Sequence, residues 1–346
     1  MKRIAFLDGF RGVAIILVVL YHAYVRYPES VPYGDRFTGV ILFKEGLLGV
    51  QLFFLLSGFV ILMTLQKTRS YLEFLKKRWL RLFPAMLIVT VILFPISQFL
   101  PERPKGVPDW VDLIPGLTFI DPTWIELFTK SKVDELEGTF WSLYVEVKYY
   151  LFFGGMYFLF GKRKAIAGIF GLYLLWVLSR ILIKVGVITP DHLFSIVIAI
   201  EILSLKHFGW FAAGSLAYLY YTSKELKYLI LATIVGSLAI LSLGLASWSS
   251  VFIASTILAV FLGTIYFDGL KQLFDNRFLV FFGFISYPLY LIHENTMIAW
   301  ITRLDRVFDM PDILLPAIPI LVLIAAAYVI AKFLEPAVLK LLKKIV

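Results

Sequence analysis

The sequence predicts an all-α membrane protein, a polytopic helix bundle of about ten transmembrane helices. Of its 346 residues, 60% are hydrophobic and only 16% are charged, whereas soluble domains carry about 25% charged residues. Apolar runs of roughly 20 residues, the length that a helix needs to cross a bilayer, recur along the whole chain. Lipid cannot pair with backbone polar groups, so spanning segments must be helices or closed barrels. These runs are continuous rather than alternating, which favours helices.

The apolar runs define ten expected membrane spans. They cover residues of about 10–27, 46–65, 82–100, 140–160, 165–183, 205–221, 227–244, 247–267, 278–301 and 313–335. The segment 191–204 is moderately apolar, and it could be re-entrant, interfacial or part of the sixth span. His192 and His207 flank this outer segment and are expected at the membrane interface. No internal repeat supports an inverted-repeat transporter, and we expect a single membrane domain, 1–346.

Basic residues indicate the orientation of these spans. The segments expected on the inside hold 19 lysines and arginines and the outer loops hold 12, so both termini are expected in the cytoplasm of a multi-pass plasma-membrane protein. The net charge of +9 is divided among short clusters between apolar runs, which fits orientation better than a nucleic-acid groove. The sequence has no cysteine, which excludes disulfides, thiolate metal sites and a cysteine acyl-enzyme, and nothing in it calls for a metal.

The first span carries two polar residues, Arg11 and His22, although a charge in a helix centre costs at least about 2.5 kcal/mol. Their separation of 11 positions corresponds to about 1100° of rotation, so both lie on one helical face, about 16 Å apart along the axis. Arg11 is expected at the cytoplasmic end and His22 in the outer half of the membrane. Both residues interrupt a stretch that otherwise resembles a signal peptide, so we expect a retained helix.

The third span opens with Arg78 and Arg81, which share a helical face at spacing i, i+3. Together with Arg11 they are expected at the cytoplasmic mouth of the bundle. Arginine binds phosphate as a bidentate fork, so these three residues would suit a nucleotide-bearing donor. The alternative is that Arg78 and Arg81 only belong to the basic cluster that orients the span.

The fourth span places Glu146 about six residues from its outer end, or roughly 9 Å deep, close to the depth of His22. A carboxylate near an imidazole can orient it and stabilise its protonated form, and the pair would then act as a general base. The alternatives are a buried structural pair, or a partnership of Glu146 with Lys148. The i, i+2 spacing turns Lys148 to a different face, which weakens the second alternative.

The ninth span contains a second histidine, in the segment Ser286-Tyr287-Pro288-Leu289-Tyr290-Leu291-Ile292-His293-Glu294. Pro288 is expected to kink the helix, and such breaks are tolerated where they line a cavity. His293, also in the outer half, either faces an acceptor or is an interfacial residue paired with Glu294. In the second span, Ser57-Gly58 is expected to be a helix-packing contact rather than a nucleophile.

Five short stretches stand out in order between residues 7 and 293. They are Leu7 to Ala14 continuing to Tyr21-His22, Gly49 to Phe54 with Leu56 to Phe59, Arg78-Trp79-Leu80-Arg81 followed by Pro84, Phe140 to Leu143 with Glu146 and Tyr149 to Leu151, and Ser286-Tyr287 to His293. In this order they resemble the motifs of the acyltransferase-3 family of bacterial and animal membrane acyltransferases. Gln51 replaces an acidic residue common in that family, and Val147-Lys148 replaces a typical Glu-Gln pair.

The resemblance implies ten core helices, an acyl-CoA donor, usually acetyl-CoA, and transfer to a hydroxyl of a surface glycan or lipid-linked sugar. By position it implies that Arg11, Arg78 and Arg81 bind the donor and that His22 carries out the chemistry, and we expect Glu146 to be its catalytic partner. The residues expected to bind the acceptor are His293, Lys148, Tyr150, Tyr290 and Trp141. The chain is expected to lack the fused extracytoplasmic esterase-like domain of some relatives.

Other classes of function remain open. A transporter or flippase for a lipid-linked sugar or an acyl compound would move its substrate without changing its covalent structure. A non-catalytic biogenesis subunit would tolerate the loss of both His22 and Arg11. For an acyltransferase, an acyl-histidine relay and direct transfer are both open. The expected partners include membrane lipid and exclude nucleic acid.

Overall fold

The computed structural model describes residues 4–187, 199–242 and 247–345, and throughout these ranges the regular elements are helices. Six of the described helices are long and apolar enough to span a membrane. They are Ala5–Tyr24, Ile41–Leu65, Tyr71–Ser97, Lys162–Lys184, Trp248–Tyr266 and Ala317–Ile345. Two shorter apolar helices are Leu226–Ser242 and Arg277–Ile292. The predicted all-α membrane class is therefore confirmed.

The first eight predicted spans each coincide with a helix. These helices are α1 (Ala5–Tyr24), α3 (Gly49–Leu65), α4 (Tyr71–Ser97), α7 (Trp141–Phe160), α8 (Lys162–Lys184), α10 (Phe208–Ser223), α11 (Leu226–Ser242) and α12 (Trp248–Tyr266). Short helices join them: α2 (Ile41–Lys44), α5 (Leu113–Thr118), α6 (Pro122–Thr129), α13 (Asp268–Phe274), and the single turns η1 (Glu45–Leu48), η2 (Trp110–Asp112), η3 (Gly138–Phe140) and η4 (Leu205–His207). Most of the segment 191–204, including His192, and the end of the seventh predicted span lie outside the described residues.

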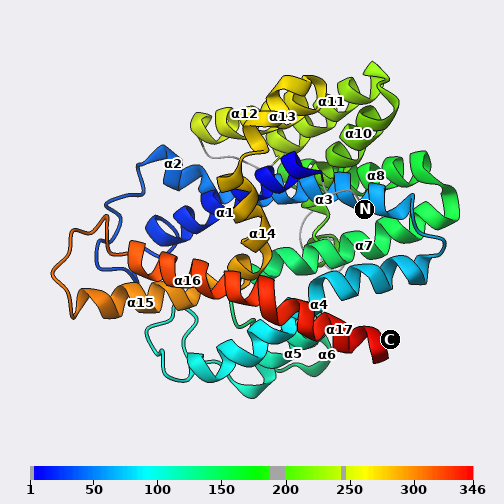
Figure 1. Ribbon diagram of the computed structural model, residues 1–346. Coiled ribbons are helices and arrows are strands. Elements are labelled where there is room, and N and C mark those ends of the chain that lie inside the picture. The colour runs from blue at the N-terminus through cyan, green and yellow to red at the C-terminus, as the bar shows by residue number, and fades with distance from the viewer. Residues whose placement is uncertain (1–3, 188–198, 243–246, 346) are drawn as a thin grey trace. The chain divides into compact units, whose positions relative to one another are not determined.

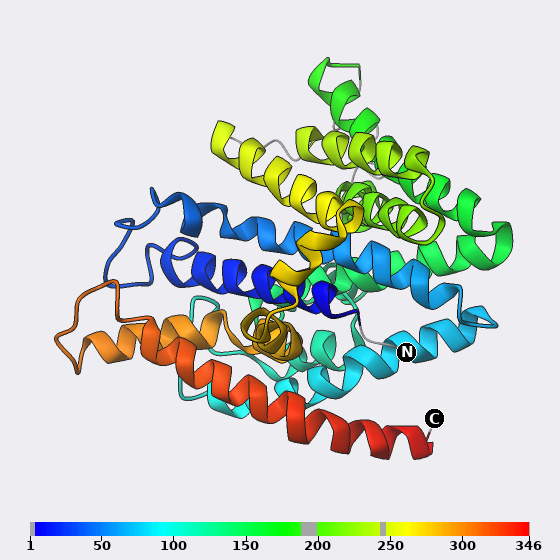
Figure 2. The ribbon, with the colours of Figure 1, turned by 45° about the horizontal axis from the view of Figure 1, so that its top comes forward.

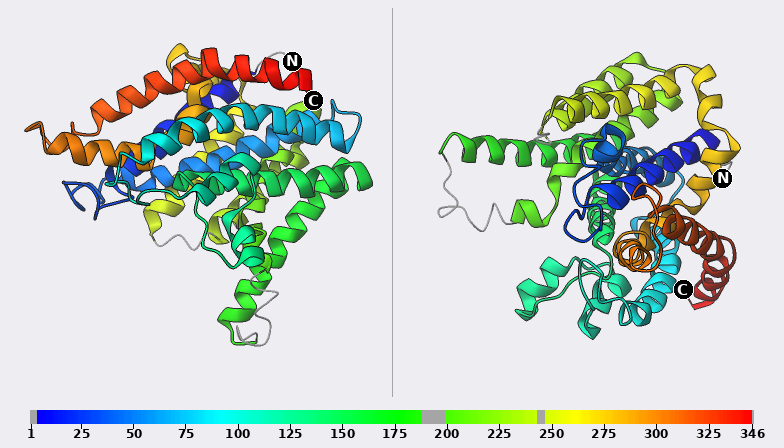
Figure 3. Two further views of the ribbon diagram at one scale, coloured as in Figure 1. Left: turned by 90° about the horizontal axis from the view of Figure 1, so that it is seen from below. Right: turned by 90° about the vertical axis from the view of Figure 1, so that its left-hand side faces the viewer.

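The ninth predicted span is not one helix. Helix α14 (Arg277–Ile292) continues through Pro288 and ends at Ile292, and α15 (Asn295–Asp305) begins three residues later. The interruption of the span predicted over 278–301 therefore comes at His293 and Glu294, and the kink expected at Pro288 does not end the helix. The last span is α16 (Ala317–Val329), which continues through the π-helical turn η5 (Ile330–Leu334) into α17 (Glu335–Ile345) as one rod, drawn orange to red in Figure 3.

The described chain divides into two compact units. The first comprises residues 1–50, 79–144 and 274–346, and the second comprises 51–78 and 145–273. Helices α3, α4 and α7 each contribute one part to each unit.

In the first unit, α1 and α14 lie side by side at very close range (Figure 1). A methyl group added to Gly12 would lie 2.1 Å from the carbonyl oxygen of Leu279, and one added to Gly283 would lie 2.0 Å from that of Asp8. Glycine is needed at such contacts because any side chain would separate the two backbones. The N-terminal parts of both helices meet in these contacts, and their C-terminal ends meet at His22 and His293, so the two helices run in the same direction.

In the second unit, α10 is buried along nearly its whole length and packs against α8, α11 and α12 (Figure 2). It also contacts α3 through two glycines. A methyl group on Gly58 would lie 2.0 Å from the carbonyl oxygen of Phe211, and one on Gly214 would lie 1.9 Å from that of Leu55. The predicted packing role of the Ser57-Gly58 pair is confirmed at Gly58.

Candidate active site

Two histidines meet where α1 and α14 end. His22, in the last turn of α1, and His293, directly after α14, approach to 3.2 Å between His22 Nδ1 and His293 Nε2. Their rings meet edge to face with centroids 4.8 Å apart. His22 is 9% exposed and His293 is fully buried. The parallel crossing of α1 and α14 therefore pairs two residues that are 271 positions apart in the sequence.

The hydrogen-bond partners of these rings fix which nitrogen carries the proton. His293 Nδ1 lies 3.1 and 3.0 Å from the carbonyl oxygens of Leu289 and Tyr290, and His22 Nδ1 lies 2.8 Å from that of Val18. A carbonyl oxygen only accepts, so each neutral ring carries its hydrogen on Nδ1. The lone pair of His293 Nε2 is a second, more distant acceptor beside the His22 Nδ1–H that donates to Val18, and the basic nitrogen of His22 is Nε2.

A buried carboxylate lies beside that basic nitrogen. Glu294 Oε1 is 3.5 Å from His22 Nε2 and accepts a hydrogen bond from the hydroxyl of Tyr27. Glu294 is 3% exposed and Tyr27 is 8% exposed. A carboxylate at this distance stabilises the imidazolium that forms when His22 Nε2 accepts a proton. The cluster of His22, His293, Glu294 and Tyr27 is thus equipped for general-base chemistry.

The chain around η3 packs against this cluster. Thr139 Oγ1 donates to the carbonyl oxygen of Tyr290 over 3.0 Å, and Ser142 Oγ lies 2.7 Å from the Tyr290 hydroxyl. A methyl group on Gly138 would lie 2.7 Å from both carboxylate oxygens of Glu294, so a side chain at this position would push the carboxylate aside. Tyr290, a predicted acceptor-binding residue, therefore lies beside the histidine pair with its hydroxyl bonded to Ser142.

A second buried carboxylate holds the start of α15. Glu137 accepts hydrogen bonds from the backbone N–H groups of Asn295 and Thr296, at 2.5 and 3.3 Å, and from Thr296 Oγ1 at 2.8 Å. Arg103 Nη2 lies 3.9 Å from Glu137 Oε1, and both side chains are buried. Burial raises the pKa of Glu137 to about 7, and the Arg103 guanidinium opposes that shift.

The predicted donor-binding arginines contact different partners. In the first unit, Arg11 forms an ion pair of 2.8 Å with Asp8, and Arg81 forms one of 3.1 Å with Glu335. In the second unit, the Arg78 guanidinium lies 5.9 Å from the ring centroid of Tyr150. A phosphate group that bound Arg11 or Arg81 would therefore compete with a carboxylate already in place.

The predicted catalytic carboxylate Glu146 lies in the second unit, where it accepts a hydrogen bond from Ser57. The carboxylate beside His22 in the first unit is that of Glu294. Lys148 is buried, and its ammonium donates to the carbonyl oxygen of Ile202 at 2.6 Å and to Ser204 Oγ at 3.2 Å.

The other predicted residues differ in burial. Tyr150 is 4% exposed in the second unit, whereas Trp141 is 39% exposed in the first. His207, which we expected at the membrane interface, is buried with its ring centroid 5.0 Å from that of Phe54.

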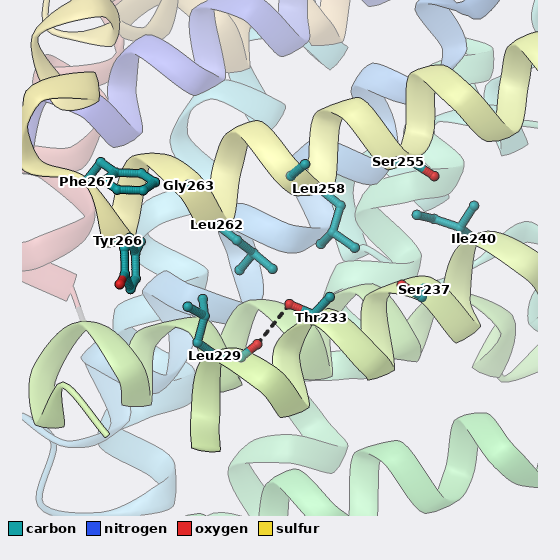
Figure 4. A pocket seen from close by; sticks show the side chains of 11 residues that line it. Leu229, Thr233, Ser237, Ile240, Ser255, Leu258, Leu262, Gly263, Tyr266 and Phe267 are labelled. Carbon is teal, nitrogen blue, oxygen red and sulfur yellow. Dashed lines mark hydrogen bonds between the residues drawn. The ribbon is translucent and has the colours of Figure 1, made fainter. Parts of the chain in front are cut away.

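A groove of about 410 Å³ runs between α11 and α12 in the second unit (Figure 4). Its lining is mostly apolar, with Leu229, Leu258 and Leu262 along it, and includes no histidine, carboxylate or amine. The Thr233 hydroxyl in its wall donates to the carbonyl oxygen of Leu229 over 3.0 Å, within its own helix. This groove has room for an apolar chain, and its polar groups are hydroxyls.

Sequence reasoning missed three residues of the first unit. Tyr27, Arg103 and Glu137 are polar residues near or in expected loops, where polarity is ordinary and carries no signal. Glu294 was considered only as a partner of His293. The glycines at positions 12 and 283 could have suggested that both helices take part in close helix packing, because small residues mark such contacts.

Sequence comparison relates the chain to known acyltransferases. A family model described as an acyltransferase domain matches residues 4–334. The chain is 29% identical to O-acetyltransferase OatA of Staphylococcus aureus over 159 residues, which cover 42% of this chain and 23% of that protein. It is 28% identical to peptidoglycan O-acetyltransferase OatA of Listeria monocytogenes over 174 residues, which cover 46% and 25% of the two chains.

A third relative is acyltransferase MdmB of Streptomyces mycarofaciens, which is 30% identical over 163 residues, or 44% of this chain and 38% of that protein. The matched part of the chain thus spans about a quarter of the length of the OatA relatives and less than two fifths of MdmB. No solved structure matches the chain.

Proposed function

This chain belongs to the acyltransferase-3 family, and from that premise we propose that it moves an acyl group, expected to be acetyl, from acyl-CoA to a hydroxyl group of an extracytoplasmic glycan or lipid-linked sugar. The observation that carries the proposal is the buried cluster of His22, His293 and Glu294. The name of the Listeria relative, a peptidoglycan O-acetyltransferase, supports a cell-wall glycan as the acceptor. The plasma membrane, where such an acceptor is met, is the proposed location.

The proposed reaction begins at His22. Its Nε2 removes the proton from the acceptor hydroxyl as the oxygen attacks the thioester carbonyl, and a new C–O bond forms. The C–S bond then breaks, and the CoA thiolate leaves with the proton that His22 had taken. General-base catalysis of this kind is worth about 10²–10⁴-fold in rate. Direct transfer needs no covalent enzyme intermediate, and an acyl-histidine relay is the alternative route.

The neighbours of His22 have separate proposed roles. The Val18 carbonyl oxygen holds the His22 proton on Nδ1, and the lone pair of His293 Nε2, 3.2 Å away, favours the same tautomer, so His22 Nε2 is the basic nitrogen. Glu294 stabilises the imidazolium, and Tyr27 holds the Glu294 carboxylate in place. His293 thereby acts through His22, in place of the predicted contact with the acceptor. The predicted catalytic role of Glu146 stays a prediction.

The donor is proposed to bind at the other end of α1. Arg11 and His22 are separated by about 16 Å of helix rise, which the pantetheine arm of acyl-CoA would have to cover. The CoA phosphates are proposed to bind Arg11, Arg78 and Arg81, displacing carboxylates such as Asp8 from Arg11. The acceptor is proposed to contact Lys148, Tyr150, Tyr290 and Trp141, as the sequence predicted.

The test is acyl transfer by purified protein in proteoliposomes supplied with ¹³C-acetyl-CoA and muropeptides. Mass spectrometry measures the acetylated product, and free CoA thiol measures thioester consumption. Replacement of His22 by Ala should lower both rates by about 10²–10⁴-fold. His207→Gln, a change at a buried histidine of the second unit, is the matched control and should retain turnover. Near-normal turnover of a folded His22→Ala protein would exclude the role of His22.

Binding of CoA distinguishes the proposed acyltransferase from the alternative, a transporter or flippase. A ligand that binds only the folded protein raises its unfolding temperature by mass action, so acetyl-CoA and CoA should both stabilise an acyltransferase. Absence of any shift at saturating CoA, together with movement of an unmodified lipid-linked sugar across the proteoliposome membrane, would favour the transporter.

A further inference from the structure

We infer that Glu137 is a positioning residue, which holds the break between α14 and α15 open so that Glu294 stays beside His22. The inference rests on the proposed function, because it concerns the placement of a proposed catalytic group. Glu137 itself touches neither histidine in any described contact; its partners are Asn295, Thr296 and Arg103.

The hydrogen bonds of Glu137 replace those that a continuous helix would make. In an α-helix the N–H groups of Asn295 and Thr296 would donate to the carbonyl oxygens four residues earlier, at Leu291 and Ile292. Here both N–H groups donate to the Glu137 carboxylate instead. Without that acceptor, two buried donors would lack partners, and the helix could regain them only by closing the break.

The carbonyl oxygens on the other side of the break also accept hydrogen bonds from side chains. His293 Nδ1 donates to the carbonyl oxygens of Leu289 and Tyr290, and Thr139 Oγ1 donates to Tyr290 as well. Side chains thus satisfy both edges of the break, with Glu137 serving the donors and His293 and Thr139 serving the acceptors. This arrangement explains why the span predicted over 278–301 is interrupted at this point rather than at Pro288.

The break decides where Glu294 points. The backbone of Glu294 has φ −79° and ψ −84°, outside the helical region. In an unbroken helix His293 and Glu294 would point about 100° apart around the axis. In the broken chain both side chains reach the same imidazole, because His293 Nε2 lies 3.2 Å from His22 Nδ1 and Glu294 Oε1 lies 3.5 Å from His22 Nε2.

Residues of the loop 101–139 hold the Glu137 side chain in position. Arg103 donates to the carbonyl oxygens of Gly106 and Leu136 and lies 3.9 Å from the Glu137 carboxylate. The backbone N–H of Lys105 donates to Asn295 Oδ1 over 3.2 Å, so the same loop also holds the first side chain of α15. The loop therefore holds the break in two ways, through Arg103 beside Glu137 and through Lys105 bonded to Asn295.

The experiment is a double-mutant cycle on acetyl transfer to muropeptides from ¹³C-acetyl-CoA. At pH 8, where Glu137 with its pKa of about 7 is ionised, Glu137→Gln keeps the size of the side chain but turns an amide group toward N–H donors, and should lower kcat by about 10- to 100-fold, the range of a hydrogen bond to a charged group. KM for acetyl-CoA should stay within about twofold, because the donor is not bound by this loop. In a Glu294→Gln background the same change should have an effect of less than about threefold, since its route to His22 is gone.

Two further variants make the result specific. Glu126→Gln is the matched control: Glu126 accepts from the backbone N–H of Val133 at 3.1 Å within the same loop, and its loss should leave kcat unchanged. If Glu137→Gln does not fold, Thr296→Val removes only one of the donors to Glu137 and should lower kcat by about two- to tenfold.

The outcomes separate this inference from the proposed function. An equal fall in kcat on Glu137→Gln in both backgrounds, or no fall at all, would overturn the positioning role. An inactive His22→Ala protein would leave the proposed function standing in that case. Full activity of His22→Ala would instead remove the proposed function, whatever Glu137→Gln does.

Discussion

Replacement of Glu294 by glutamine tests the electrostatic part of the proposed site. The substitution keeps the size of the side chain and an oxygen that can accept from Tyr27, but it removes the negative charge beside His22. At the observed separation of 3.5 Å, two unit charges attract by about 5 kcal/mol at an effective dielectric constant of about 20. Burial of both groups justifies an interior value over that of water.

That energy sets the expected loss of activity. Each 1.36 kcal/mol corresponds to about a tenfold change in rate, so complete loss of the interaction would cost about 10³-fold or slightly more. The imidazolium forms only as the proton is transferred, so the loss should appear in kcat rather than in KM for acetyl-CoA. We expect kcat of Glu294→Gln to fall by about 10²–10³-fold.

The assay is release of CoA thiol and formation of acetylated muropeptides by proteoliposomes. Tyr27→Phe is the companion variant, because it removes the hydrogen bond to Glu294 but keeps the charge. Its loss should be about tenfold, the value of one hydrogen bond to a charged group. A Glu294→Gln protein that works within about fivefold of the parent, with its unfolding temperature preserved, would refute the assignment of imidazolium stabilisation to Glu294.

Two predictions concern stability. Gly283→Ala should lower the unfolding temperature in differential scanning fluorimetry, because a methyl group 2.0 Å from the Asp8 carbonyl oxygen must separate α1 from α14 at a cost of about 1–3 kcal/mol. Gly155→Ala in α7, where an added methyl meets nothing within 4 Å, is its control and should be neutral or stabilising; equal behaviour of the two variants would contradict the close crossing. For Glu137, whose pKa burial raises from 4.5 to about 7, the folded protein holds a proton between these pH values that the unfolded chain has lost. Stability should therefore fall as pH rises through this window, by up to about 3 kcal/mol, and Glu137→Gln should flatten the dependence of unfolding temperature on pH; an unchanged slope would count against it.

The sequence alone determined the class of the fold and most of its helices. A segment in lipid must satisfy its backbone internally, so length and hydropathy are sufficient to locate a span. Because polar groups are costly in such a segment, the sequence also identified His22 and His293 as candidate functional residues. These arguments succeed because they concern one helix and its solvent, and they require no knowledge of its neighbours.

The partner of His22 could not be obtained in this way. Similar depth in the membrane made Glu146 the expected carboxylate, but depth gives no information on which helices are adjacent. The backbone contacts of Gly12 and Gly283 decide that α14 lies against α1, and this brings Glu294 to His22.

The interruption of the ninth span was likewise decided by tertiary structure. The sequence predicted a span over 278–301 with a kink at Pro288, whereas the helix passes through Pro288 and ends at Ile292. The break exists because Glu137, more than 150 residues earlier, supplies the acceptor that Asn295 and Thr296 would otherwise find within the helix. Sequence thus determined which segments are helical in lipid, whereas the choice between intrahelical and long-range hydrogen bonds at one point depended on the folded chain as a whole.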